Sequence, residues 1–389
     1  MAQPKDFGFG AEERMVRDGA RKLLREQAGI ETLRKLVARD HREAYESAVQ
    51  PARFDERLWQ QMVALGWTAL AVPEAAGGVG MRTIAVAALA EEVGRAALPS
   101  PLIATLIGTA VLRAAAARGC EAAAAWLGRV AAGEAVSLAA TGTDGGWEPE
   151  STDVRAAATG GGVTLAGSAH FVQDARKARF FVVAAADTGG VGLYAVPADA
   201  PGLMIHPDRI VDLTRDQARV ELRDVAVDGA AVVAPPGEGA AVLADALPAI
   251  LAIVAADMCG AAEWQLQTTA EYARVRTQFD HPIGFFQAVK HPIVNMMIAV
   301  DRARSLTYAA ACAVDTEPAE ALRLARMAKA AASDAAAFCS DRSVQLHGGI
   351  GFTWECDVHL YFKRQQHNEA LYGDAAYQRG RIAEMLGDR

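Results

Sequence analysis

Residues 345–355 read Gln345-Leu-His-Gly-Gly-Ile-Gly-Phe-Thr-Trp-Glu355. Glycines let a backbone approach a phosphate or an adenine ring closely, and they leave peptide N–H groups free to donate. Upstream, residues 272–287 read Tyr272-Ala-Arg-Val-Arg-Thr-Gln-Phe-Asp-His-Pro-Ile-Gly-Phe-Phe-Gln287. The guanidinium of Arg276 can fork onto pyrophosphate oxygens, and the ring of Phe279 can pack against a flat heterocycle. The two stretches therefore point to a phosphorylated ligand with an aromatic part.

The bulk properties narrow the class of protein. A chain of 389 residues is expected to form two or three structural units. Its net charge of −8 argues against general nucleic-acid binding. Five scattered cysteines without a C-x-x-C pair indicate reduced thiols and predict neither a disulfide framework nor a metal site. The polar N-terminus lacks a signal peptide, and no stretch reads as a membrane span, so the prediction is a soluble, cytoplasmic protein.

The pattern of apolar residues along the chain changes twice, from helical to β-favouring and back to helical. Residues 10–133 show helical apolar periodicity, residues 136–233 alternate short β-favouring runs with Gly, Asp and Thr, and helical patterns return after a Pro-Pro-Gly break at 235–237. The predicted domains are 1–133 (helical), 134–237 (β) and 238–389 (helical). The predicted strands lie near 163–165, 169–172, 180–184, 192–196 and 218–222, and the predicted C-terminal helices near 240–275, 286–314, 318–346 and 374–386.

Both quoted stretches closely resemble the flavin-contacting signatures of the acyl-CoA dehydrogenase family. Residues 65–80, followed by Glu91-Glu-Val-Gly-Arg95, resemble its N-terminal signature, so the resemblance spans essentially the whole chain. It implies an α+β fold with an N-terminal helical domain, a central antiparallel β-barrel or sandwich, and a C-terminal four-helix bundle that mediates oligomerisation. It also implies FAD as the cofactor.

The resemblance assigns residues to two halves of a flavin site. In the family, Arg276 and Phe279 reach across a dimer interface to the FAD of a neighbouring subunit. The tripeptide that lies beside the flavin of a subunit itself is Trp-Ile-Thr in relatives and Phe171-Val-Gln here. His347 either lines the adenine pocket or is a packed structural histidine. The full set of expected FAD contacts is Arg276, Phe279, Gln287, Gln345, Gly348, Gly349, Phe171, Val172 and Gln173.

The sequence departs from the family at the catalytic base. Removing the α-proton of an acyl thioester requires a carboxylate in a dry pocket, which most relatives supply as Glu-Gly-Thr before the last helix. The glutamate position is Tyr372 here, and a phenol with a pKa of about 10 is a poor base at neutral pH. A second branch of the family carries its glutamate where this chain has Ile250. Asp374 and Glu369 are the substitute bases to consider.

Three interpretations therefore remain open. The first is a self-sufficient FAD-dependent dehydrogenase that desaturates an acyl-CoA thioester with an unrecognised base and passes electrons to an electron-transfer flavoprotein. The second is a non-catalytic partner subunit of a heterotetrameric acyl-CoA dehydrogenase of the kind known from steroid side-chain oxidation. The third is a flavin monooxygenase or oxidase on the same scaffold. The first two predict a homo- or hetero-oligomer built as a dimer of dimers.

Overall fold

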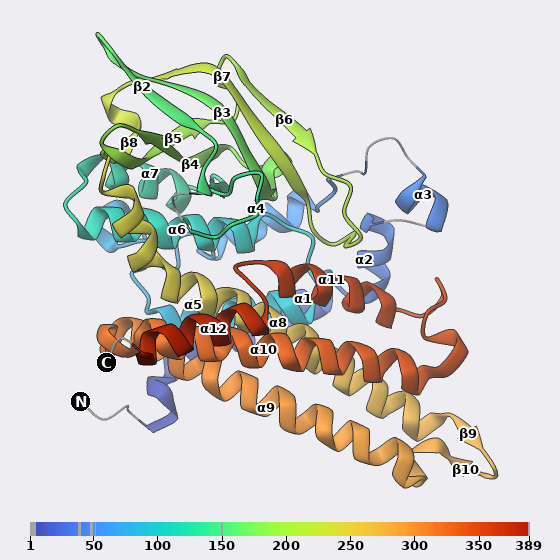
Figure 1. Ribbon diagram of the computed structural model, residues 1–389. Helices are drawn as coiled ribbons and strands as arrows, with labels where there is room; N and C mark the ends of the chain where they lie inside the picture. The colour runs from blue at the N-terminus through green and yellow to red at the C-terminus, as the bar shows by residue number, and fades with distance from the viewer. Residues whose placement is uncertain (1–4, 38–39, 47–49, 51, 149–150, 388–389) are drawn as a thin grey trace.

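Two helical regions enclose a β-region in the order that the sequence predicted (Figure 1). The computed structural model describes residues 5–37, 40–46, 50, 52–148 and 151–387. The acyl-CoA dehydrogenase-like fold class is confirmed, with an N-terminal helical domain, a central sheet and a C-terminal helical region.

The N-terminal region is built around helix α5. All twelve residues from Thr83 to Gly94 in this helix are buried, as expected for a helix that is apolar on every side. Its many alanines let the neighbouring helices approach closely. The elements of this region are η1 (Lys5–Gly8), α1 (Ala11–Gln27), α2 (Ile30–Val37), α3 (His41–Tyr45), α4 (Glu56–Ala64), η2 (Glu74–Ala76), α5 (Thr83–Arg95), α6 (Leu102–Ala117) and α7 (Glu121–Ala131).

The β-region is one mixed sheet with the strand order β6-β7-β3-β2-β4-β5-β8. Most neighbours are antiparallel, as predicted, but β1 pairs with β4 in parallel and β2 touches β4 in parallel at a single position. The predicted runs at 163–165 and 169–172 belong to one continuous strand, β3. The strands are β1 (Val136–Ala139), β2 (Arg155–Thr159), β3 (Gly162–Gln173), β4 (Phe180–Asp187), β5 (Gly190–Pro197), β6 (Leu203–Pro207), β7 (Gln217–Val227) and β8 (Val232–Ala234), with η4 (Ala175–Lys177) and η5 (Gly229–Ala231) between them.

Strand β4 joins the sheet to the helices because both of its faces are buried. Its sequence Phe-Phe-Val-Val-Ala-Ala has no polar alternation, which is typical of a strand covered on two sides. Phe180 and Val182 pack into the large core that the helices share, whereas Phe181 and Val183 pack into the separate core of the β-region. The two-residue period of a strand thus divides one segment between two cores.

Helix α8 is the centre of the C-terminal region and contacts α5, α6, α9, α10 and α11. It is long and apolar enough to cross a membrane, but 72% of its most apolar window is buried inside the structure, as in the core helix of a soluble protein. Helix α11 was not predicted. The elements are α8 (Gly239–Val275), β9 (Thr277–Gln278), β10 (His281–Pro282), η6 (Ile283–Phe285), α9 (Gln287–Thr316), α10 (Pro318–His347), η7 (Gly348–Ile350), α11 (Val358–Ala370) and α12 (Ala375–Gly387).

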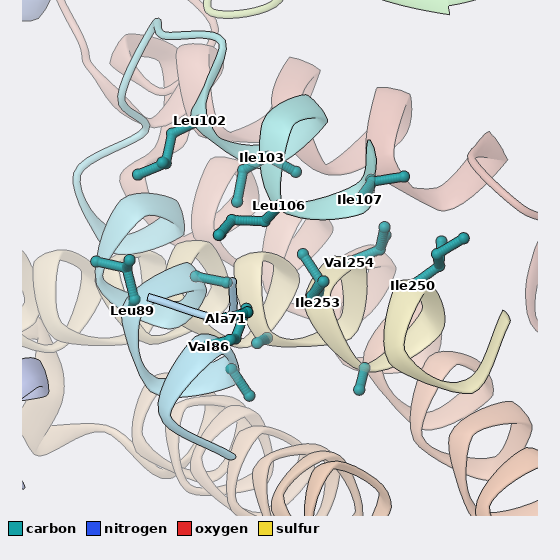
Figure 2. Close-up of a cluster of buried hydrophobic side chains, with 14 of the residues drawn as sticks. Ala71, Val86, Leu89, Leu102, Ile103, Leu106, Ile107, Ile250, Ile253 and Val254 are labelled. Atoms are coloured by element: carbon teal, nitrogen blue, oxygen red, sulfur yellow. The ribbon is translucent and has the colours of Figure 1, made fainter. Parts of the chain in front are cut away.

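Helices α5 and α8 cross at two reciprocal glycines. A Cβ atom on Gly260 would lie 1.8 Å from the carbonyl oxygen of Glu91, and one on Gly94 would lie 1.9 Å from that of Asp257. Only glycine allows the two backbones to come this close. Figure 2 shows the apolar side chains beside the crossing, including Val86 of α5 and Ile253 of α8.

We expect Gly260→Ala to lower the free energy of unfolding by about 3 kcal/mol, because the added methyl group meets backbone rather than a movable side chain. Gly19→Ala in α1 is the matched control: its Cβ has nothing within 4 Å, and it should stabilise the protein by up to about 1 kcal/mol through helix propensity. Urea denaturation followed by circular dichroism measures both. Equal effects of the two substitutions would contradict the close crossing.

Candidate active site

A cavity of about 240 Å³ lies where the N-terminal helices, the sheet and the C-terminal helices meet. Tyr372 and Ile250, the two positions predicted from the family resemblance for the catalytic glutamate, line this cavity, as do Phe171 and Gln173 from the end of β3. Ile107 and Ile250, at the edge of the apolar cluster in Figure 2, also belong to its wall. The cavity therefore combines the expected catalytic position with two of the residues expected beside the flavin.

Tyr372 presents a neutral phenol to the cavity. Its ring packs against Trp147, with 4.7 Å between the ring centroids and 31° between the ring planes. Burial raises the pKa of Tyr372 further above its ordinary value, which makes the phenolate still less accessible. Ile250 has no titratable group. Neither of the two family base positions can therefore accept an α-proton at neutral pH.

The backbone around Tyr372 is firmly held. Tyr372 has a φ of 56° and Gly373 a φ of 85°, so the chain passes through the left-handed region twice between α11 and α12. The ammonium group of the buried Lys329 donates to the carbonyl oxygens of Glu369 at 3.1 Å and Gly373 at 2.9 Å. Gln378 donates to the carbonyl oxygen of Tyr372. These contacts fix the tyrosine in the cavity wall.

Neither substitute base lies in the cavity wall. Asp374 is exposed and accepts a hydrogen bond from the backbone N–H of Tyr377 at 2.8 Å, so it caps α12. Glu369 belongs to α11, where burial raises its pKa and Lys329 opposes that rise. Its side chain is also absent from the cavity lining.

Among the described lining residues the one carboxylate is Glu148, which the sequence analysis did not single out. It lies on the loop between β1 and β2, accepts from the hydroxyl of Tyr377 at 2.8 Å and pairs with Arg381 at 3.3 Å. Its side chain is 48% exposed. An exposed and ion-paired carboxylate lacks the dry surroundings that a general base for an α-proton needs. In the sequence, the only feature that could have singled out Glu148 is its place between a tryptophan and a proline, in Trp-Glu-Pro.

Six other expected FAD contacts lie away from the cavity, on the C-terminal helices and the turns that join them. Arg276 ends α8, Phe279 occupies the β9–β10 turn with a φ of 53°, and Gln287 begins α9. Gln345 lies in the last turn of α10, and Gly348 and Gly349 follow in η7. The stacking of Tyr272 of α8 on His347 of α10, at 4.4 Å between ring centroids, joins the two segments.

These distal residues are exposed, whereas Val172 is not. Phe279 is 85% exposed, and Cβ atoms added to Gly348 or Gly349 would meet nothing within 4 Å. Val172 packs in the core of the β-region and does not line the cavity. Large apolar side chains surround the distal set and form the distal apolar patch: Val275, Phe279, Phe285, Val294, Met297, Ile298, Ile350 and Phe352. Exposed large apolar side chains close in sequence to exposed polar anchors are typical of a protein–protein contact.

His347 is a structural histidine in this arrangement. Its Nδ1 bonds the carbonyl of Ser343 at 2.8 Å, and its ring is stacked on Tyr272. Burial lowers its pKa below the usual value, so the ring is neutral at physiological pH. Because Nδ1 donates to Ser343 and the ring is neutral, His347 has no second N–H group to donate to a phosphate.

A buried ionic cluster joins the β-region to the C-terminal helices. The carboxylate of Asp257 on α8 accepts from Arg215 at 2.7 Å and from Arg364 of α11 at 2.5 Å, and Asn368 donates to it as well. Burial alone would raise the pKa of Asp257, but the two guanidinium groups hold it below its ordinary value. Arg215 comes from the loop that precedes β7, so one carboxylate joins the sheet to two helices.

We expect Asp257→Asn to lower the free energy of unfolding by about 3–5 kcal/mol, because it leaves two buried guanidinium groups without a counter-ion. Asp245→Asn is the control on the same helix, where the pair with Arg118 is exposed and contributes at most about 1 kcal/mol. Chemical denaturation of both variants tests this difference. A similar small loss in both would show that the buried cluster contributes little.

Gln173 links the cavity to this cluster through His367. Its Oε1 lies 2.7 Å from Nε2 of His367, and its Nε2 donates to Gln217 at 2.9 Å. Burial lowers the pKa of His367 to about 4. A neutral histidine can donate this hydrogen bond through Nε2. At the position of Gln173 the family pattern has a small hydroxyl, which an amide held by two hydrogen bonds replaces here.

Acidification should destabilise the protein through His367. Its folded-state pKa of about 4 lies below the unfolded value of about 6.5, so the unfolded chain binds the extra proton as pH falls from 6.5 to 4. The stability lost over this window is up to about 3 kcal/mol. His367→Gln keeps an amide donor for Gln173 and should flatten the pH dependence of the melting temperature between pH 6.5 and 4. Parallel wild-type and variant curves would contradict a neutral buried His367.

A helical domain, a central sheet and a C-terminal helical region, in this order, form the architecture of the acyl-CoA dehydrogenase fold. The "Acyl-CoA dehydrogenase, N-terminal domain" family matches residues 10–134, and the "Acyl-CoA dehydrogenase, C-terminal domain" family matches residues 237–387. "Acyl-CoA dehydrogenase IpdE2" of Mycobacterium tuberculosis is 32% identical over 91% of this chain and 90% of its own length.

Solved structures of the same family superpose on nearly the whole chain. A chain of the ChsE4-ChsE5 complex from Mycobacterium tuberculosis has a TM-score of 0.84 at 27% identity and covers 98% of both chains. A chain of the Tcur3481-Tcur3483 steroid ACAD has a TM-score of 0.84 at 28% identity and covers 98% of this chain and 99% of its own. This protein belongs to the acyl-CoA dehydrogenase family, whose members are FAD-dependent oxidoreductases that act on CH–CH groups, and its structural neighbours are oligomeric complexes.

Proposed function

We propose that this chain is the partner subunit of a hetero-oligomeric, FAD-dependent acyl-CoA dehydrogenase, in which a second subunit type supplies the catalytic glutamate. The observation that carries this proposal is the contrast between the two halves of the flavin site. The cavity of this chain has a phenol and an isoleucine where a base is needed, whereas the set at the distal end retains every residue type that the family offers to a neighbour.

The distal set suits the pyrophosphate and adenine of FAD bound largely by another subunit. Arg276 has a planar fork of donors that matches two phosphate oxygens, and the peptide N–H groups at Gly348 and Gly349 have no side chains in their way. The distal apolar patch supplies an interface around them. FAD held there would accept the β-hydride of an acyl-CoA while the carboxylate of the partner takes the α-proton. An electron-transfer flavoprotein is the proposed electron acceptor.

A self-sufficient dehydrogenase is the second candidate, and one observation favours it. Glu148 places a carboxylate in the same cavity as Tyr372, so a rearrangement that dries this loop would create a base. In that case Glu148→Gln would abolish turnover of the chain alone. If the chain is the partner subunit, the chain alone shows no turnover, with or without this substitution.

The flavin content of the purified chain decides between the two candidates. We expect the chain alone to bind well under one FAD per subunit by its absorbance at 450 nm. Co-expression with a glutamate-carrying acyl-CoA dehydrogenase subunit from the same genome should give full occupancy and anaerobic bleaching by an acyl-CoA. Near-stoichiometric flavin that bleaches in the chain alone would refute the partner role.

Arg276→Ala in the co-expressed complex should reduce flavin occupancy by at least about tenfold, because a desolvated phosphate contact is lost. Arg274→Ala is the matched control two residues away, since Arg274 is exposed and pairs with Glu271 on the surface of the same helix. Flavin per complex and complex mass, measured together, separate cofactor loss from dissociation. Unchanged occupancy in Arg276→Ala would remove this arginine from the flavin site.

A further inference from the structure

The cavity beside Tyr372 has an apolar body and one polar end. Its apolar wall comes from α6, α8, β1 and the start of α10 and includes Ala104, Ile107, Leu138, Leu243, Leu247 and Leu322. The polar end is formed by the side chains of Arg326 on α10, Gln378, Tyr377 and Arg381 on α12, and Glu148 on the β1–β2 loop. Such a division matches a ligand with a hydrocarbon body and a polar head.

Arg326 is a buried charge, and no carboxylate among the described residues lies within ion-pairing distance of it. The residue is 5% exposed, its Nη1 donates to the Oε1 of Gln378 at 3.0 Å, and its Nε has no hydrogen-bond partner. Within the described part of the chain it forms no ion pair, and burial lowers its pKa. An uncompensated buried cation costs several kcal/mol, so a side chain in this state is usually completed by an anion.

The other charges at this end compensate one another. Glu148 is held by the hydroxyl of Tyr377 and by Arg381, and the second nitrogen of Arg381 pairs with Glu384 at 2.9 Å on the outer face. The side chains of Glu148, Arg381 and Glu384 are all partly exposed, so water screens any charge that these ion pairs do not neutralise. One buried positive charge, on Arg326, remains to be matched inside the cavity.

We propose that this cavity binds a monocarboxylic acid with an apolar body, whose carboxylate pairs with Arg326 and whose hydrocarbon part lies against α6 and α8. A guanidinium presents parallel donors that fit a planar carboxylate, and the pair gains strength where water is excluded. A single negative charge is what the cavity lacks, whereas a CoA pyrophosphate would bring more than one and would find Arg381 already paired. The proposal rests on the proposed function, in which this cavity holds no flavin, because Phe171 and Gln173, the residues expected beside the subunit's own flavin, line the same wall.

An occupant of this site would also contact the segment that replaces the family base. Gln378 accepts from Arg326 and donates to the carbonyl oxygen of Tyr372, so it connects the two. Trp147 lines the same cavity and stacks on Tyr372. A bound acid would therefore contact the packed pair of Trp147 and Tyr372, in a subunit that has no base with which to transform the acid.

Isothermal titration calorimetry of the full-length chain with octanoate, octanol and octanoyl-CoA tests this site. We expect octanoate to bind at least tenfold more tightly than octanol. Arg326→Met should remove that preference and leave octanol binding unchanged, since the apolar wall is intact. Arg323→Met, one turn earlier on α10 and outside the cavity, is the control and should bind octanoate like the wild type.

Several results would overturn the proposal. They are the absence of octanoate binding to the wild type, equal affinities for octanoate and octanol, and unchanged octanoate binding by Arg326→Met. Binding of octanoyl-CoA without any binding of octanoate would assign the anion to phosphate and reject a carboxylate site. If Arg326→Met does not fold, Arg326→Lys keeps the charge without the planar fork and should bind octanoate more weakly, while the wild-type comparison of octanoate with octanol still decides. Failure of this test leaves flavin occupancy in the co-expressed complex, and thus the proposed function, unaffected.

Discussion

The structure depends most on the place where Asp257 lies. Its carbonyl oxygen is so close to Gly94 that α5 and α8 can cross there only without a side chain between them. Its carboxylate accepts from Arg215, which comes from the β-region, and from Arg364 of α11. A single residue of α8 thus touches the N-terminal helices, the sheet and the C-terminal helices. Since the charge is buried and satisfied from several directions, the three regions are held in one relative arrangement.

The cavity is a consequence of this arrangement, because it opens beside α8 where the three regions meet. Two positions that are far apart in sequence, Ile250 and Tyr372, become neighbours in its wall. Neither side chain can accept an α-proton at neutral pH. Arg326, in the same wall, has a buried Nε without a hydrogen-bond partner. The distal end of the bundle is the opposite case: its polar anchors and its apolar side chains are exposed, and we propose that another subunit covers them. Both ends of the molecule therefore point to partners that the single chain does not contain.

Much of this could be predicted from local patterns. The long apolar periodicities located α8, α9 and α10, and the signatures around Arg276 and Gln345 indicated the family before any geometry was known. Helix α11 was missed because its sequence, which contains two histidines and two glutamines, shows little apolar periodicity. Its buried side includes Arg364 and Asn368, which are polar and are satisfied only by tertiary partners. The parallel contact of β1 with β4 was missed for a related reason, since strand direction depends on chain connections that a propensity pattern does not contain.

By itself the sequence determined the class of fold and the family, because both depend on residue identity and spacing, and it predicted Tyr372 and Ile250 at the two usual base positions. Tertiary structure alone decided what the remaining polar groups do. Asp374 became a helix cap and Glu369 lay outside the cavity, while Glu148 entered the wall from a loop of the β-region. The physical reason is that the role of a charged side chain depends on burial and on the distance to its partners. Both quantities are properties of the folded chain and vary among residues that look alike in sequence.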